Sequence, residues 1–197
     1  MTRQLCGALP YSVRVTNGGN CVEFMSVAGA GRYRQAVPDQ ANGASAKGSI
    51  DVAPYAVDFG TAEYISIGAM RSEEIYGGAA SSVRPLSSMS PSQVNFPPHV
   101  WPRNSVSRRF YLLNAPDAFC LFGEQLRFYP DQLIDAPDVD LESGYDLMAR
   151  RVQVDGTPFT LSAASDHRNI RLILRMRFTE GNESLVFEQE VAIRNVP

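Results

Sequence analysis

The chain has 197 residues, a formal net charge of −3 at pH 7, 44% hydrophobic residues and 20% charged residues. A chain of this length can bury enough apolar surface to fold without a metal or a disulfide, and its composition is that of an ordinary globular protein. The small negative charge and the scattered arginines give no reason to expect a nucleic-acid partner. No stretch of the sequence approaches the roughly 20 apolar residues of a membrane-spanning helix.

The chain opens with a short helical segment. Residues 2–9 have helical composition, and Pro10 ends the helix because it lacks a backbone N–H and disfavours the α conformation in the residue before it. Eight residues are fewer than the roughly 12 to 15 that an isolated helix needs. We therefore expect this segment to be the end of a longer helix.

A β-hairpin is predicted directly after it. Residues 11–16 and 21–25 alternate apolar and polar side chains, and residues 17–20 have the sequence Asn-Gly-Gly-Asn, which tolerates positive φ. A turn centred on Gly18 and Gly19 places apolar side chains opposite apolar side chains, and a positively charged side chain opposite a negatively charged one. The predicted pairs are Val15 with Val22, Arg14 with Glu23, and Val13 with Phe24.

This region carries a resemblance to a known family. Residues 8–20, then Glu23 and Phe24, then residues 29–34 resemble the segment that follows the helix in type IV minor pilins and pilin-like proteins. The last residues, 188–197, are similar to the way those proteins end. Within the family, the chain is most similar to a minor pilin of the mannose-sensitive haemagglutinin (MSHA) pilus system.

The resemblance implies a fold and a function. The fold would be α+β, a single pilin-like domain over residues 1–197 in which an antiparallel β-sheet packs on the C-terminal end of a truncated N-terminal helix. The function would be structural and not enzymatic: a minor pilin that takes part in type IV pilus assembly and surface attachment, with other pilin subunits as its partners. Alternatives are a type II secretion pseudopilin and a carbohydrate-binding adhesin head.

The resemblance also implies a location. Such proteins carry an apolar helix that anchors them in the inner membrane and later packs in the filament, and here it would lie upstream of residue 1. The protein would then reside at the inner membrane and periplasm before assembly and in the extracellular pilus afterwards. Met1 would not be the native start in that case; the alternative is that Met1 is genuine and the protein never meets a membrane.

Three cysteines, Cys6, Cys21 and Cys120, allow one disulfide and leave one thiol over. The resemblance implies a bridge from the position of Cys120 to a later strand, but residues 152–161 contain no cysteine. Two alternatives remain: Cys120 pairs with Cys6 or Cys21, or the cysteines are free and buried.

The middle of the chain alternates between strands and loops. Residues 26–37 are expected to be extended, with Gly29 and Gly31 permitting close approach, and residues 38–49 form a loop by composition. Strands are predicted at 50–53 and 63–70.

Residues 71–107 contain five prolines and many serines, so we expect an irregular excursion with at most a short strand near 93–96. Such loops are often functional. His99 and Trp101 lie within it and are candidate binding residues, and the alternative is that Trp101 packs back onto the sheet.

Regular alternation returns at 108–114, 118–122 and 126–129, with Gly123 and Glu124 as the turn between the last two strands. An acidic loop follows at 131–146. Its Asp138, Asp140 and Glu142 are a candidate calcium site, although the glycine falls one position too late for an EF-hand loop. The alternative is a solvated acidic loop. Apart from calcium, no cofactor is expected.

A second hairpin is predicted at the end of the chain, with its turn at Gly181 and Asn182. One face should be core and the other should face water. The predicted core-face pairs are Phe178 with Leu185, Met176 with Phe187, Leu172 with Val191, and Ile170 with Ile193; on the opposite face Arg175 pairs with Glu188 and Arg177 with Val186.

No catalytic constellation is apparent in the sequence. His99 and His167 lack the spacing of a zinc site, and neither a G-x-S-x-G elbow nor a phosphate-binding glycine loop occurs. Ser165, Asp166 and His167 are adjacent in the chain, and adjacent residues cannot converge as nucleophile, base and orienting group.

Overall fold

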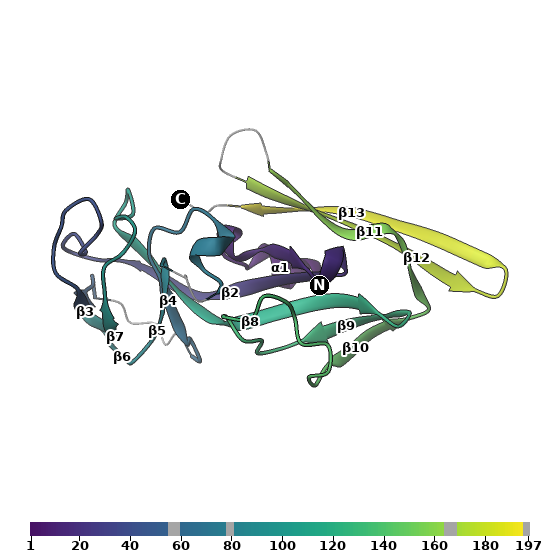
Figure 1. Cartoon of the computed structure of the whole chain (residues 1–197), viewed down its shortest axis with the longest axis horizontal. Helices are drawn as coiled ribbons and strands as arrows, with labels where there is room; N and C mark the ends of the chain where they lie inside the picture. The colour runs from purple at the N-terminus through teal and green to yellow at the C-terminus, as the bar shows by residue number, and fades with distance from the viewer. Residues whose placement is uncertain (55–59, 78–80, 164–168, 195–197) are drawn as a thin grey trace. The chain divides into compact units, whose positions relative to one another are not determined.

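The computed structural model describes residues 1–54, 60–77, 81–163 and 169–194 (Figure 1). Of the residues in these ranges, 55% are in strands and 8% are helical, and the strands described there form three antiparallel sheets. The expected α+β fold, with a sheet packed on an N-terminal helix, is therefore wrong. The helix α1 is a single turn of five residues, Thr2–Cys6, and the chain then turns at Gly7 and enters the 3₁₀ turn η1, Pro10–Ser12.

Alternation of apolar and polar side chains, rather than helical periodicity, dominates the rest of the sequence, which explains the high strand content. None of the helices in the described ranges is long and apolar enough to cross a membrane.

The chain forms two compact units. The first comprises Met1–Ser26 and Pro116–Pro197, and the second comprises Val27–Ala115. Strands β2 (Cys21–Arg32) and β8 (Arg109–Phe122) each contribute residues to both units. Each unit has its own apolar core: Phe24, Phe119 and Phe159 belong to that of the first unit, and Phe96 and Phe110 to that of the second.

In the first unit, the N-terminal hairpin is confirmed in its turn and in two of its three predicted pairs. The predicted first strand, residues 11–16, is shorter than expected, because residues 10–12 form η1 and Val13 precedes the strand. Strand β1 (Arg14–Thr16) pairs antiparallel with β2, with Arg14 opposite Glu23 and Val15 opposite Val22. The turn η2, Asn17–Gly19, joins the strands, and its three residues all have positive φ.

The predicted turn at Gly123 and Glu124 is also confirmed. It joins β8 to β9 (Gln125–Tyr129), with Phe122 opposite Gln125, and both of its residues have positive φ, as a type I′ turn requires. Strand β10 (Asp146–Arg150) pairs with the other side of β9.

The remaining sheet of the first unit has the order β11-β12-β13, formed by β11 (Val152–Ala163), β12 (Asn169–Glu180) and β13 (Glu183–Arg194) (Figure 1). Every predicted pair of the β12–β13 hairpin is present. The prediction that one whole face is core is only half correct. Leu172, Met176 and Val191 are buried, whereas Leu185 and Phe187, nearer the turn, are exposed.

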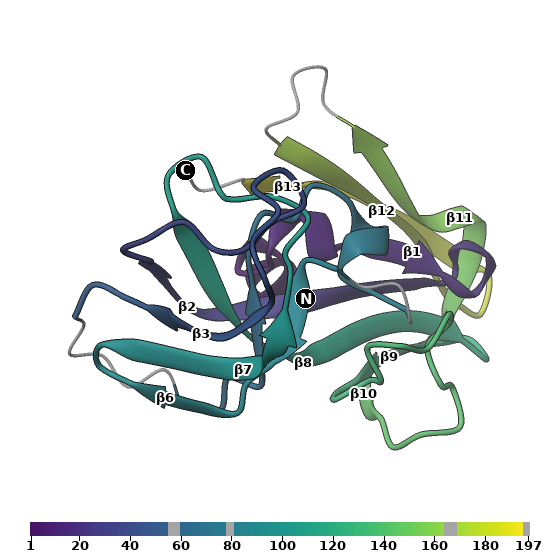
Figure 2. The same cartoon turned by 60° about the vertical axis from the view of Figure 1, so that its left-hand side comes forward.

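In the second unit, the described residues of the range 71–107 are more regular than predicted. They contain η3 (Ser72–Glu74), β5 (Val83–Pro85), β6 (Ser88–Ser90) and β7 (Gln93–His99), and β7 is the central strand of a sheet with the order β3-β7-β6 (Figure 2). Strand β3 spans Lys47–Asp51, and β4 (Tyr64–Ser66) pairs with both β5 and β8.

The prolines of β7 are tolerated because of where they fall. Pro97 and Pro98 lie beyond the last residue that pairs with β6, which is Asn95. On the other side the register with β3 shifts between Lys47 and Ser49, so a regular ladder is interrupted opposite the prolines. A proline count alone therefore could not exclude a central strand here.

Candidate functional site

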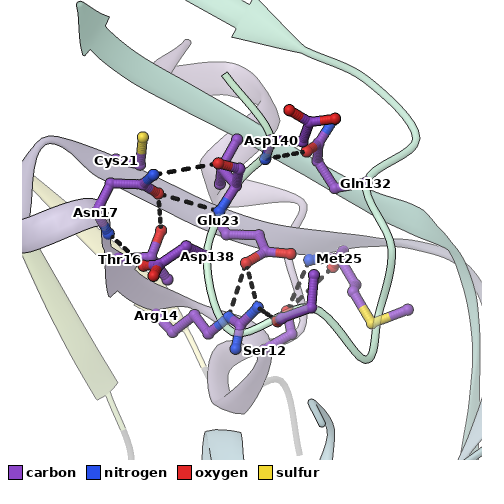
Figure 3. A network of polar contacts seen from close by, with 12 residues as sticks. Ser12, Arg14, Thr16, Asn17, Cys21, Glu23, Met25, Gln132, Asp138 and Asp140 are labelled. Atoms are coloured by element: carbon purple, nitrogen blue, oxygen red, sulfur yellow. Dashed lines mark hydrogen bonds and ion pairs between the residues drawn. The ribbon is translucent and has the colours of Figure 1, made fainter. Parts of the chain in front are cut away.

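A network of polar contacts joins the N-terminal hairpin to the acidic loop of residues 131–146, within the first unit (Figure 3). Its centre is the cross-strand pair of Arg14 and Glu23. The Arg14 Nε and Nη2 atoms each lie 2.7 Å from Glu23 Oε2, and Nη2 also donates to the carbonyl oxygen of Ala136 at 2.7 Å. The guanidinium thus ties a buried carboxylate to the loop.

Glu23 has an unusual proton affinity. Its side chain is only 1% exposed, and burial raises its pKa from the ordinary value of 4.5 to about 7. The charge of Arg14 opposes this shift and that of Asp138 adds to it. A general acid or base must reach its substrate. Glu23 instead points at Arg14 inside the protein, so the geometry gives it a structural role.

Asn17 fixes the loop from the turn of the hairpin. Its backbone N–H donates to Asp138 Oδ1 at 2.8 Å, its Nδ2 donates to the Val139 carbonyl at 3.1 Å, and its Oδ1 accepts from the Val139 N–H at 3.0 Å. The side-chain amide therefore pairs with Val139 as a neighbouring strand would. Positive φ at Asn17 brings the amide to this position.

The three candidate calcium ligands are engaged within this network or lie beside it. Asp138 accepts from Asn17, and Asp140 Oδ1 accepts from the backbone N–H of Glu142 at 3.0 Å. Gln132 Oε1 in turn accepts from the Asp140 N–H at 3.1 Å. Across the described ranges, no three His, Cys, Asp or Glu side chains are grouped so that they could hold a metal ion. Calcium binding by Asp138, Asp140 and Glu142 stays a prediction from sequence.

The candidate binding residues of the second unit, His99 and Trp101, lie side by side. Trp101 is fully buried, with its ring edge-on to Phe96 and His99 at centroid distances of 5.4 and 4.9 Å. It packs into the core, the alternative weighed above, and its ring is not available for stacking on a sugar.

Both ring nitrogens of His99 are engaged. Nδ1 lies 2.9 Å from Arg84 Nη2, and Nε2 lies 2.7 Å from the Ser81 carbonyl oxygen. Because a guanidinium only donates, Nδ1 accepts and Nε2 carries the proton. Burial and the charge of Arg84 lower the pKa of His99, although the Ser81 contact opposes them. A neutral His99 therefore links the end of β7 to Ser81 and Arg84.

Arg103, near the end of residues 71–107, contacts Glu74 and Gly68. Its Nη1 and Nη2 atoms lie 2.7 and 2.8 Å from the two carboxylate oxygens of Glu74, and Nη1 also donates to the Gly68 carbonyl at 2.6 Å. The hydrogen bonds from Arg103 lower the pKa of Glu74. This bidentate pair ties Arg103, near the end of the proline-rich segment, to Glu74, near its beginning.

The cysteines follow one of the predicted alternatives. Cys21 and Cys120 form a disulfide with a Cα–Cα distance of 4.1 Å, and Cys6 is a free, exposed thiol. Ser165, Asp166 and His167 lie outside the described residues.

Sequence reasoning missed two features of the first unit. One is the role of Asn17 and Gln132 in holding the acidic loop, since long-range amide contacts have no local signal. The other is an open cavity of about 290 Å³ near the β12–β13 turn, lined in part by Arg151, Phe178 and Leu185. The apolar alternation placed Phe178 and Leu185 on one face but did not indicate where the core ends.

No family model matches the chain, and the searches of curated proteins and of solved structures likewise found no match.

Proposed function

We propose that this chain is a structural subunit of a type IV pilus, of the minor-pilin kind found in the MSHA system, and that it takes part in pilus assembly and surface attachment. The observation that carries the proposal is the Cys21–Cys120 disulfide. Disulfides persist in oxidising compartments such as the bacterial periplasm and cell exterior. A pilus subunit folds in the periplasm and works at the cell exterior.

The resemblance of residues 8–20, 23–24, 29–34 and 188–197 to minor pilins supports this class among exported proteins. The α+β fold of pilins is not part of the proposal, since the chain is mostly β. In this proposal an apolar helix upstream of residue 1 anchors the subunit in the inner membrane before assembly and packs with other pilin subunits in the filament. The acidic loop and residues 71–107 are surfaces for contacts with those subunits.

The test is mass spectrometry of surface filaments purified from the native organism. We expect peptides of this chain at low stoichiometry relative to the major subunit, together with an apolar N-terminal extension that begins in a methylated residue. A native protein that stays in the cytosol would contradict the proposal. Recovery with secretion-system subunits in place of pilus subunits would favour the pseudopilin alternative.

One observation favours a carbohydrate-binding head as the second candidate. Phe122 and Tyr145 are exposed, and the Cζ atom of Arg127 lies 5.0 and 4.1 Å from their ring centroids. Sugars stack on aromatic rings and accept hydrogen bonds from guanidinium groups. The guanidinium already covers one face of each ring, which ranks this candidate second. Glycan binding that is lost in Tyr145→Ala would raise it to first.

A further inference from the structure

Strand β13 is the edge of its sheet. It pairs with β12 along all twelve of its residues, and in the described part of the chain no strand pairs with its other side. The edge of an antiparallel sheet presents backbone N–H and C=O groups that can accept a further strand. Figure 1 shows β12 and β13 as a long ribbon with the turn at its end.

This edge is apolar where natural edges are usually protected. Leu185, Val186 and Phe187 are consecutive and are 69, 43 and 39% exposed. Val154, in the same cross-strand row as Phe187, is 53% exposed. Charged residues and proline commonly block edge pairing, and here the charges lie to either side of the apolar triplet.

We propose that β13 pairs antiparallel with β13 of a second copy of this chain, with the two Val186 residues opposite each other on a two-fold axis. This register places Leu185 opposite the partner's Phe187, and Phe187 opposite the partner's Leu185. All three exposed apolar residues of β13 then meet apolar residues, and the apolar row of each sheet continues into the other.

Charge selects the same register. It sets Glu183 opposite Gln189, Glu188 opposite Ser184, and Glu190 opposite Asn182, so no two carboxylates face each other. Moving the axis to Phe187 sets Glu188 opposite Val186, and moving it to Leu185 sets Glu183 opposite Phe187. Within its own chain, Glu188 lies 3.4 Å from Arg175 and Glu190 lies 3.2 Å from Arg171, which limits repulsion across the seam.

The inference goes beyond the proposed function and does not depend on it, because it follows from the edge strand alone. The first test is site-directed disulfide trapping in the Cys6→Ser background, which removes the exposed thiol. Val186→Cys should form a disulfide-linked dimer on mild oxidation, since opposed residues of paired strands have Cβ atoms about 5 Å apart. Ser184→Cys, two residues away, should not, because it faces Glu188 of the other copy.

Mixing the Ser184→Cys and Glu188→Cys proteins should restore cross-linking, which fixes the register. Equal trapping of Val186→Cys and Ser184→Cys would overturn the proposal, as would no trapping of Val186→Cys. In either case a different partner for the edge, such as a strand of another subunit, would have to be sought.

Sedimentation of the whole chain over a range of concentrations provides the second test. The wild type should pass from monomer to dimer, and Leu185→Lys should raise the dissociation constant by about tenfold or more. Leu185 is exposed in the single copy, so this variant should retain its thermal unfolding midpoint. A wild type that stays monomeric at every concentration, or a variant that dimerises as well as the wild type, would overturn the proposal.

Discussion

At Glu23, burial and pairing act against each other on one carboxyl group. Because the pKa is raised from 4.5 to about 7, the folded protein keeps a proton that the unfolded chain releases between these values. The free energy of unfolding therefore falls as pH rises through this window, by about 3 kcal/mol at most. We expect Glu23→Gln to remove this fall, so that the difference between wild type and variant, measured by urea unfolding from pH 4 to 8, changes with pH.

Asp117 also makes the free energy of unfolding fall as pH rises, over a lower pH range, because burial raises its pKa from 3.8 to about 6. Asp117→Asn is therefore the matched control. It should flatten the plot of unfolding free energy against pH between these two values, and it should leave the decrease in unfolding free energy near pH 7 in place. A difference between wild type and Glu23→Gln that is constant from pH 4 to 8 would show that folding does not shift the pKa of Glu23, and would contradict this prediction.

Among the elements, strand β2 shows a close approach that only glycine permits. A Cβ atom on Gly31 would lie 2.6 Å from Cζ of the buried Phe110 ring. We expect Gly31→Ala to lower the free energy of unfolding by about 1–3 kcal/mol, since the ring has to move within a packed core. Gly144→Ala is the control, because nothing lies within 4 Å of its Cβ position and its φ is not positive. Thermal unfolding of both variants checks this; equal midpoints would contradict it.

The elements also differ in how far sequence could predict them. Both hairpins were predictable in register, because Gly18 and Gly181 mark the turns and alternation allows few pairings. Strand β7 was not predictable at its full length. Its prolines fall where β6 has ended and where the pairing with β3 shifts register, and only the tertiary structure reveals this.

In the candidate site, the Arg14–Glu23 pair followed from that register, whereas its contact with Ala136 joins residues 122 positions apart, which no local pattern encodes. The exposed position of Leu185 depends on how far the core of the first unit extends along the hairpin.

For the whole molecule, the Cys21–Cys120 disulfide constrains the unfolded chain over a separation of 99 residues. A bridge that closes so long a loop stabilises a protein by about 2–5 kcal/mol. We expect the double variant Cys21→Ser, Cys120→Ser to lose this amount of free energy of unfolding, and therefore to unfold at a lower urea concentration. The single variant Cys6→Ser should behave as wild type. If the wild type unfolds identically with and without reductant, the bridge contributes no stability.

The same bridge has a consequence for proteolysis. All of the second unit, Val27–Ala115, lies in the chain between the two bridged cysteines. A protease that cuts once anywhere in this unit would yield two pieces that remain one molecule. The nicked protein should migrate as intact chain in a denaturing gel without reductant and separate into two bands with it, so a single cut in this unit would release neither piece from a protein whose bridge is intact.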